Sequence, residues 1–479
     1  MNIQKKLTTM SLLITAMMGC NSDPNNETVI ESIKPFTIAM IPDTQNMVDY
    51  THQTSFFDST GAIDESFPMD SAEQFITMMQ YISENTINNG GNIAFLASVG
   101  DVWQHQSYEI DTEHQDRGHE IATNNVLALN LGDYHNSQTR SFELPKSKEG
   151  YDFIRDSGIP FGVAPGNHDS DAMWVDTTIP GVDMFTATGE ADLNACVLEN
   201  IEQRFPAVCF GILHIGGNEN FNSIFGAESE YFNDQPWYVG SYHGGASSAQ
   251  VFSAGGYQFL NINFEMQPSN EVLSWGQSMV DAYPGIPTLI TTHDFLDGAA
   301  ERAGNPIVDL VVADPDNHNS ANDVFDKLIT KNDQIFMVLS GHHHGKARRT
   351  DTNDKGNNVY QILADYQDRG QSYLDAIAEN GGNEPDETVG IGDGWFRMME
   401  FDLDREMPVM NVRTYSTHYN TFSNEQTEYT DYYLESERKY SGTVSGDTLT
   451  AEQFNEQDDF TIELTDFVKR FGLPNPKYN

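Results

Sequence analysis

The 479-residue chain is predicted to adopt an α/β fold with a layered core, and three observations support this expectation. Hydrophobic residues make up 38% of the sequence, which is ample for a sizeable core and excludes wholesale disorder. Five short apolar runs are typical of buried central strands. Helical patterns lie between the runs, and strands that alternate with helices indicate helices packed against sheets.

The five candidate strands share one property, which is that each runs directly into polar residues. The candidate strands are residues 36–41, 93–99, 161–164, 288–292 and 335–340. The polar residues that follow them are Asp43 and Gln45, Asp101, Asn167 to Asp169, His293, and His342 to His344. Because open α/β sheets place their sites at the carboxyl ends of the strands, we expect these side chains to converge on one rim.

Three helices are predicted from apolar residues at helical spacing. Ser71 and Gln74 are expected to form a capping box at the start of the first helix. Asn270 is expected to cap the second helix, and the third spans residues 321–331.

The region after Arg349 is expected to close a second sheet. Its candidate strands are residues 359–363, 395–401 and 409–415, and a last strand is expected from the alternation of Phe460, Ile462 and Leu464. The acidic, Gly-rich segment 371–391 is interpreted as a loop. Asp365 to Gln367 end one of these strands, and they either return to the rim or form an ordinary strand terminus.

Two segments between the motifs are interpreted as insertions. Residues 102–147 contain several histidines among many acids, which favours a solvated loop, with an extra metal site as the alternative. Residues 171–256 are rich in aromatics, which are expected to pack a small core of their own. The alternative is that these rings stack on a nucleobase or sugar above the rim.

The first residues are typical of an export signal. Lys5 and Lys6 precede the apolar stretch 7–18, which ends in Gly19-Cys20 and resembles a bacterial lipoprotein signal. We therefore expect residues 1–19 to be removed, Cys20 to be lipidated and residues 20–34 to form a polar tether. An ordinary signal peptide with an incidental cysteine is the alternative. The expected location is the cell envelope, at the outer membrane or facing the periplasm, through the lipid anchor alone.

Two further cysteines, Cys196 and Cys209, remain if Cys20 carries lipid. In an exported protein such an even pair predicts a disulfide that closes a short loop, and two unpaired buried thiols are the alternative.

The charge balance excludes several classes of partner. Lys and Arg number 25 against 72 Asp and Glu, giving a net charge of -47. Extended nucleic acid and a broad anionic membrane face both require clustered basic residues, so neither is expected as a partner. If the substrate is itself an anion, bound cations are the obvious means of overcoming the repulsion.

The motifs after the five strands supply what two closely spaced divalent ions need, namely a bridging carboxylate, imidazoles and oxygen ligands from separate strands. In order they are Asp43-Thr44-Gln45, Gly100-Asp101, Gly166-Asn167-His168-Asp169, Thr292-His293 and Gly341-His342-His343-His344. With these motifs the chain resembles the calcineurin-like metallophosphoesterase superfamily over roughly residues 36–416. The resemblance implies a four-layer α/β sandwich, with two central mixed β-sheets flanked by helices.

The resemblance also implies roles for individual residues. Asp43, Gln45, Asp101 and His344 would hold the first metal, and Asp101, Asn167, His293 and His342 would hold the second, with Asp101 bridging. The catalytic residues would be Asp101 and His168, with His168 beside the phosphate, where it would stabilise the transition state or protonate the leaving oxygen. Asn167 and His168 would contact the substrate. The superfamily most often has a histidine where this chain has Gln45, whose neutral amide oxygen suits harder ions. The two ions would be Mn, Fe, Zn or Mg.

The implied function is a metal-dependent phosphoesterase that hydrolyses phosphomonoesters or phosphodiesters of a small phosphorylated substrate. A water shared by two divalent ions loses a proton near neutral pH, and the hydroxide attacks phosphorus in line. Residues 35–420 would form the catalytic domain, and residues 421–479 would be a C-terminal extension packed on it. The alternative is a binding or scaffold lipoprotein that has the same fold without catalysis.

Overall fold

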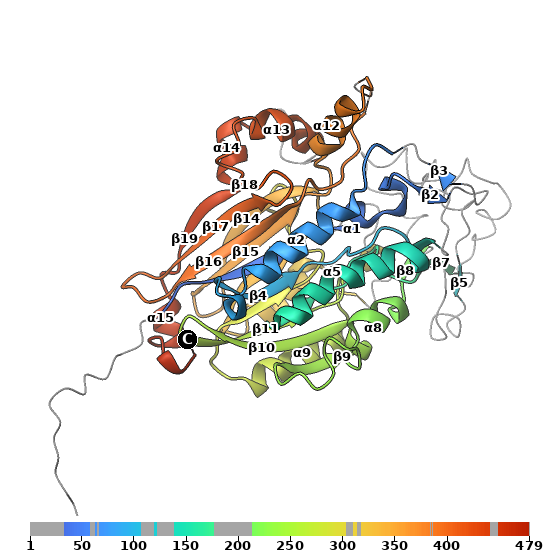
Figure 1. The fold of residues 1–479 in the computed structure, drawn as a ribbon. Coiled ribbons are helices and arrows are strands. Elements are labelled where there is room, and N and C mark those ends of the chain that lie inside the picture. The colour runs from blue at the N-terminus through green and yellow to red at the C-terminus, as the bar shows by residue number, and fades with distance from the viewer. Residues whose placement is uncertain are drawn as a thin grey trace, which may run out of the picture. The chain divides into compact units, whose positions relative to one another are not determined.

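The computed structural model of the chain describes residues 33–57, 63–64, 67–106, 119–121, 138–176, 213–302, 310–313, 318–383, 385, 387–440 and 449–478. Two β-sheets, each with seven of the described strands, form the centre of the unit Ile33–Asn479 (Figure 1). No helix in the described ranges is long and apolar enough to cross a membrane.

The first sheet has the strand order β18-β17-β16-β1-β4-β6, and β19 pairs with β17. Its strands are β1 (Phe36–Ile41), β4 (Ile93–Ser98), β6 (Phe161–Val163), β16 (Trp395–Asp402), β17 (Val409–Ser416), β18 (Thr421–Phe422) and β19 (Asp459–Glu463). Strands β1, β4 and β6 are parallel, whereas β16 joins β1 antiparallel. The carboxyl ends of three parallel strands therefore lie at one edge of this sheet.

The second sheet has the strand order β14-β15-β13-β12-β11-β10-β9. Its strands are β9 (Tyr238–Tyr242), β10 (Ser247–Ala254), β11 (Tyr257–Asn263), β12 (Thr288–Thr291), β13 (Ile335–Ser340), β14 (Gly345–Thr352) and β15 (Asn358–Asp365). Neighbouring strands from β11 to β15 are parallel, and the flanking β10 and β14 are antiparallel to them.

Apolar side chains fill the space between the two sheets. Along β1, Phe36, Ile38 and Met40 face the second sheet, whereas Ala39 and Ile41 belong to a separate core on the other face. Because side chains alternate across a strand, a strand that is covered on both faces reads as one continuous apolar run. This is the physical reason why the sequence of β1 shows no polar alternation.

Helices cover the two outer faces. The helices α2 (Ala72–Glu84) and α5 (Leu144–Ser157) pack on the first sheet. The second sheet is covered by α9 (Asn270–Ala282) together with α11 (Ala321–Val324) and η5 (Phe325–Ile329). The result is a four-layer sandwich of helix, sheet, sheet and helix (Figure 1), which confirms the predicted fold class.

The remaining elements are short. They are α1 (Gln45–Val48), η1 (Tyr50–His52), η2 (Ile87–Asn89), η3 (Thr139–Glu143), α8 (Glu219–Phe225), η4 (His243–Gly245), α10 (Leu310–Ala313), α12 (Gln371–Glu379), α13 (Tyr429–Tyr440), α14 (Ala451–Glu456), α15 (Phe467–Phe471) and η7 (Pro476–Tyr478). Two small sheets consist of β2 (Phe56–Phe57) with β3 (Ile63–Asp64), and of β5 (His119–Ile121), β7 (Ala172–Asp176) and β8 (Leu213–Gly216).

Several sequence-based expectations about local structure are wrong. The strands after Arg349 do not close one sheet, because β15 joins the second sheet whereas β16 and β17 extend the first. Residues 371–379 form helix α12 instead of a loop, and the backbone N–H groups of Gln371 and Ser372 donate to the distant carboxylate of Asp393. Such a cap lies more than 20 residues away in sequence and leaves no local signal.

Two predicted helix caps also differ from those observed. Ser71 makes no cap hydrogen bond, because its hydroxyl donates to the carbonyl of Met47 at 2.7 Å and joins α1 to α2 instead. At α9 the cap lies one residue earlier than expected, since the Ser269 side chain accepts from the N–H of Val272. Asn270 is the first residue of the helix.

The aromatic segment before β10 packs into the main structure. Tyr231, Phe232 and Trp237 surround the ring of Phe161 in β6, with centroid separations of 5.8, 5.1 and 5.7 Å. These rings therefore belong to the core under α5 rather than to a small core of their own. The strands β9 and β10, which also fall within residues 171–256, are members of the second sheet.

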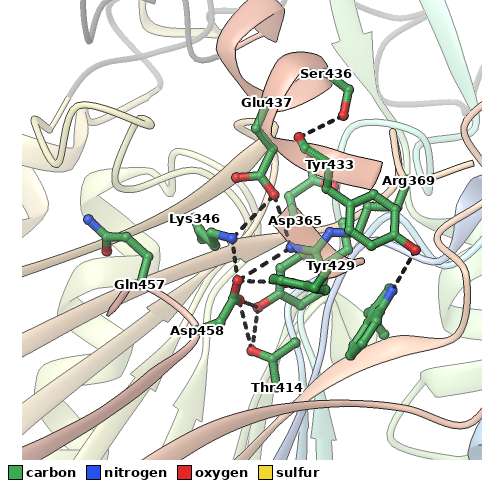
Figure 2. A network of polar contacts seen from close by, with 12 residues as sticks. Lys346, Asp365, Arg369, Thr414, Tyr429, Tyr433, Ser436, Glu437, Gln457 and Asp458 are labelled. Atoms are coloured by element: carbon green, nitrogen blue, oxygen red, sulfur yellow. Dashed lines mark hydrogen bonds and ion pairs between the residues drawn. The ribbon is translucent and has the colours of Figure 1, made fainter. Parts of the chain in front are cut away.

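The C-terminal segment closes a buried polar network (Figure 2). Asp458 is 1% exposed and lies between the side chains of Lys346, Arg369 and Arg397. Its carboxylate also accepts hydrogen bonds from Tyr429 at 2.6 Å and Thr414 at 2.9 Å. Burial alone would raise the pKa of Asp458, but the neighbouring cations outweigh it and hold that pKa well below its usual range.

We predict that Asp458→Asn destabilises the fold by about 3–5 kcal/mol, because it leaves buried cations without their anion. Urea unfolding at pH 7 measures this loss. A carboxylate whose pKa is lower in the folded state than in the unfolded state stabilises the fold. This stabilisation is complete above the unfolded-state pKa of about 3.9 and is lost as the pH falls toward the folded-state pKa. The gap between the variant and the wild type should therefore narrow below about pH 4.

The matched control is Asp402→Asn, which removes an exposed carboxylate paired with Arg405 at 3.3 Å. A surface pair of this kind contributes about 0–1 kcal/mol. Equal losses in the two variants would contradict the structural role assigned to Asp458.

Candidate metal centre

The polar residues after the parallel strands meet at one rim, where the two sheets are joined by hydrogen bonds. The ring nitrogen Nδ1 of His293, after β12, lies 2.8 Å from the carbonyl oxygen of Val99, after β4. The backbone N–H of His342, after β13, donates to Oδ1 of Asp43, after β1, at 3.0 Å. Residues from both sheets therefore share this rim.

Four of the predicted ligands converge around one ring nitrogen, Nε2 of His293. This atom lies 3.3 Å from Oδ1 of Asp101, 3.1 Å from Oδ1 of Asn167 and 3.2 Å from Nδ1 of His342. Ligand atoms of Asp101, His293 and His342 all lie within 4.8 Å of one another, and the three residues are buried. The arrangement matches the residues expected for the second metal.

The hydrogen bonds of His293 show how this cluster can take up positive charge, either as a proton or as a metal ion. A carbonyl oxygen can only accept, so the contact with Val99 places a proton on Nδ1 of His293. In the neutral ring, Nε2 then presents a lone pair to the oxygen atoms of Asp101 and Asn167. Such a contact is repulsive unless a proton or a metal ion lies between the atoms. Burial alone would lower the pKa of His293, but Asp101 and Asp43 outweigh it and raise the pKa to about 10.

Two glycines let the carboxylates approach the backbone. A Cβ at Gly166 would lie 2.1 Å from Oδ1 of Asp101, and a Cβ at Gly341 would lie 2.1 Å from Oδ2 of Asp43. A Cβ atom cannot lie so close to a carboxylate oxygen, so any larger residue at these two positions would clash. The glycines that open the third and fifth motifs are therefore needed because they lack a side chain, not because of their backbone flexibility.

The backbone at the rim is strained. Asp101 has φ of 50° and His342 has φ of 68°, and both lie in the left-handed region that residues with a Cβ rarely adopt. Each such residue costs on the order of 1–3 kcal/mol, and strain of this kind concentrates at functional sites. The strained residues here are the shared carboxylate and one of the imidazoles.

The residues expected for the first metal are linked in a chain rather than gathered in one cluster. Nε2 of Gln45 donates to Oδ2 of Asp101 at 3.1 Å and also contacts the side-chain oxygen of Gln367. Gln367 in turn contacts His344, and the other ring nitrogen of His344 contacts Asp368. Asp43 contacts the other half of the rim, because its Oδ1 accepts the backbone N–H of His342.

Several buried oxygen and nitrogen atoms at the rim that could bind a metal have no hydrogen-bond partner within the described part of the chain. They are Oδ2 of Asp43, Oε1 of Gln45, Nε2 of His342 and Oδ2 of Asp365. Burying a polar atom without a partner costs about 1–3 kcal/mol. Carboxylate, amide and imidazole donors are the types that bind divalent ions such as Mn²⁺, Fe²⁺ and Zn²⁺, so the residues present fit the implied metals.

The pKa values of the rim residues also indicate that the rim suits divalent cations. Burial, followed by the repulsion of Asp365, raises the pKa of Asp43 well above its ordinary value. Burial, followed by the neighbouring His293, lowers the pKa of His342 well below its ordinary value. A carboxylate crowded by carboxylates and an imidazole crowded by imidazoles are both stabilised when a shared cation takes the place of protons.

His168 lies at the edge of the cluster and is partly exposed. Its backbone N–H donates to Oδ1 of Asp101 at 2.9 Å, and its Nδ1–H donates to the carbonyl oxygen of Gln104 at 2.6 Å. The carbonyl fixes the tautomer, so the remaining ring nitrogen, Nε2, is the atom available for proton transfer. Gln104 thus supports His168 through its backbone rather than through its side chain.

The sequence motifs contained two supporting residues whose roles only the structure reveals. Asp169 accepts from the N–H groups of Val102 at 2.9 Å and Gly166 at 2.8 Å, and so ties the second motif to the third. Burial, followed by repulsion from Asp101, raises the pKa of Asp169 to about 7. Nε2 of His343 lies 3.1 Å from Oδ1 of Asp294, and the ligand atoms of these two residues and of His342 lie within 4.8 Å of one another.

A second cluster lies in the segment that was predicted to be an insertion. His105 contacts Oε1 of Glu143 at 2.6 Å, with Asp49 at 3.9 Å. Their carboxylates already accept backbone hydrogen bonds, for example from Tyr50 at 3.1 Å and Thr51 at 2.7 Å. These contacts link the loop after β4 to the segment after α1, and the ligand atoms of Asp49, His105 and Glu143 also lie within 4.8 Å of one another, as the alternative of an additional metal site requires.

Some predicted positions cannot be located. Cys20, Cys196 and Cys209 lie outside the described residues, so the expected lipid attachment and disulfide stay predictions.

The basic pair Arg348 and Arg349 after the last motif lies on β14. Arg348 stacks over Phe460 at 4.1 Å, and Arg349 pairs with Glu301 at 2.6 Å.

The fold and the rim together define an α/β sandwich protein with a buried carboxylate–imidazole centre suited to divalent cations. No protein-family model matches the chain. An uncharacterized protein of Bacillus subtilis (strain 168), YvnB, is 25% identical over 266 residues, which is 54% of this chain and 14% of that relative. The chain thus matches only a small part of the relative's length.

Among solved structures, a dimetal phosphatase from Danio rerio is similar to this chain with a TM-score of 0.37 and 11% sequence identity. The match covers 80% of this chain and 97% of that chain.

We predict that divalent metal stabilises the folded protein, because cations bind a rim that exists only in the native state. Adding Mn²⁺ at a hundredfold excess over its dissociation constant to chelator-treated protein should stabilise it by about 2.7 kcal/mol per site. Thermal unfolding with and without Mn²⁺ measures the effect. Asp101→Asn, which removes the shared charge, should lose most of it, and an unchanged melting temperature of the wild type in Mn²⁺, Zn²⁺ and Mg²⁺ would contradict the account.

Proposed function

We propose that the protein is a metal-dependent phosphoesterase that hydrolyses a small phosphomonoester or phosphodiester. The convergence of Asp101, Asn167 and His342 on the ring nitrogen Nε2 of His293 carries this proposal. The partly exposed His168 beside the cluster adds a group for proton transfer. A buried cation centre next to a histidine of fixed tautomer is an arrangement suited to phosphoryl chemistry.

The proposed ligand sets follow the two halves of the rim. Asp43, Gln45, Asp101 and His344 would hold one ion, and Asp101, Asn167, His293 and His342 would hold the other. Bound there, two divalent ions supply charge neutralisation for phosphoryl oxygens and a nucleophile from water at neutral pH. Mn, Fe, Zn and Mg are the candidate ions.

His168 is the proposed general acid. Its Nδ1–H is held by the carbonyl of Gln104, which leaves Nε2 to give a proton to the leaving oxygen. Its backbone N–H donates to Asp101, so the ring is anchored to the carboxylate that the two ions would share. Together with Asn167, it would also contact the phosphate.

The charge of the chain restricts the substrate. With a net charge of -47, an extended polyanion would be repelled over most of the surface. A small phosphate ester needs positive charge only at the rim, where bound cations reverse the local sign. We therefore propose a small phosphorylated substrate rather than extended nucleic acid.

We predict that the metal-loaded protein hydrolyses p-nitrophenyl phosphate, bis-p-nitrophenyl phosphate or both. His168→Gln should lower kcat about 10²- to 10⁴-fold, because general acid catalysis contributes a factor of that size. The loss should be smaller for esters with better leaving groups, which need less protonation. Steady-state rates on a series of substituted phenyl phosphates measure both effects.

The matched control is His418→Gln, which changes a histidine whose ring lies beside Gln74 rather than at the rim. It should leave the rates unchanged. Tight metal binding without turnover on either ester or on a wider phosphate panel would favour the alternative, a binding or scaffold protein with this fold.

We also propose a cellular location for the protein. The basic pair, apolar stretch and Gly19-Cys20 at the start of the sequence favour an exported protein held at the cell envelope by lipid on Cys20. Detergent phase separation of the protein expressed with its native first residues tests this. The wild type should enter the detergent phase and Cys20→Ser should remain in the aqueous phase, whereas a wild type without attached lipid would contradict the anchor.

A further inference from the structure

The strand β15 brings a sixth strand end to the metal rim. It lies parallel to β13, with Ser340 paired to Leu363, so its terminal Asp365 lies level with His342. Its antiparallel partner β14 pairs Gly345 with Asp365, which places Asp365 beside the residue that follows His344. The register of two separate strand pairs therefore directs Asp365 to the proposed ligands.

Asp365 has the features of a ligand rather than of an ordinary strand terminus. The residue is 2% exposed, and its Oδ1 accepts from the backbone N–H of Gln367 at 3.0 Å. Its Oδ2 has no hydrogen-bond partner among the described residues. One oxygen is thus fixed by the turn, and the other is buried without a hydrogen-bond partner among the described residues.

Gln367, two residues further on, lies between the two halves of the first ligand set. Its side chain contacts both Gln45 and His344, and its backbone carbonyl accepts from Nδ2 of Asn46 at 3.2 Å. The other ring nitrogen of His344 is held by Asp368. The turn 365–368 therefore contacts the two outer residues of the first site from one side.

We propose that Asp365 is an additional carboxylate ligand of the first metal and that Gln367 positions Gln45 and His344 for it. This inference rests on the metal centre of the proposed function and deepens it. With Asp365, the first site has oxygen donors from Asp43, Gln45, Asp101 and Asp365 and one imidazole from His344. Such an oxygen-rich set selects a hard divalent cation, Mn²⁺ or Mg²⁺, over Zn²⁺.

The same turn is preorganised by the C-terminal segment. Arg369 follows Asp368 directly, and its N–H donates to the carbonyl of Tyr366 at 3.0 Å. Its guanidinium lies 3.9 Å from the ring centre of Tyr366 and 4.9 Å from that of Tyr433, and it donates to Glu437 at 2.9 Å (Figure 2). Residues whose geometry is fixed by such packing can hold a ligand without reorganisation.

Mn²⁺ binding to the full chain, after removal of bound metal with a chelator, tests the inference without relying on activity. Isothermal titration calorimetry of the wild type should resolve two sites, and electron paramagnetic resonance should show two coupled Mn²⁺ ions. Asp365→Asn keeps the shape of the side chain but removes its charge. It should weaken one site at least about tenfold, leave the other within about twofold, and reduce the preference of the weakened site for Mn²⁺ over Zn²⁺.

Gln367→Leu is a second variant that leaves the proposed carboxylate in place. It should weaken the same site about 10- to 100-fold, as loss of a group that orients a metal ligand does. The matched control is Asp351→Asn, because Asp351 lies at the opposite end of the same hairpin, paired with Val359, and contacts Arg302 and Arg349. The Asp351→Asn variant should bind two Mn²⁺ ions as the wild type does.

The outcomes separate the two proposals. Two sites in the wild type that remain unchanged in Asp365→Asn, with circular dichroism like that of the wild type, would overturn the ligand assignment and leave the proposed function standing. Two sites with the expected loss in Asp365→Asn, but without phosphoesterase turnover, would support the ligand and contradict the function. A wild type that binds no Mn²⁺ would overturn both.

Discussion

The arrangement depends on a concentration of like charge at the ends of parallel strands. Asp43, Asp101 and Asp365 are each no more than 2% exposed, and they lie at one rim together with imidazoles that partly offset their charge. Burying several carboxylates together is costly, so a divalent cation bound at this rim would relieve the repulsion between them. The strained backbone of Asp101 and His342 and the close approach at Gly166 and Gly341 follow from holding these groups in place.

The distribution of positive charge complements this rim. The chain has only 25 Lys and Arg against 72 acidic residues, yet Lys346, Arg369 and Arg397 are buried together around Asp458. These cations stabilise the C-terminal segment and the turn after β15 instead of meeting a substrate. The protein therefore uses some of its few basic side chains inside the fold.

The parts of the fold and site that could be predicted are those with a local signal. The strands β1, β4, β6, β12 and β13 were visible because strands buried on both faces form continuous apolar runs, and their polar ends were adjacent in sequence. The features that were missed depend on distant partners. Helix α12 is capped by Asp393, β16 pairs with β1 more than 350 residues away, and Gln367 meets Gln45 only because β15 lies beside β13. No local pattern encodes such pairings.

The most direct test of the central claim is anomalous X-ray diffraction from crystals of the chain loaded with Mn²⁺. The account predicts two anomalous peaks at the rim, with the side chain of Asp101 bridging them. One peak should lie among Asn167, His293 and His342, and the other among Asp43, Gln45 and His344. Peaks elsewhere, for example between His105 and Glu143, or an absence of bound metal at the rim, would contradict it.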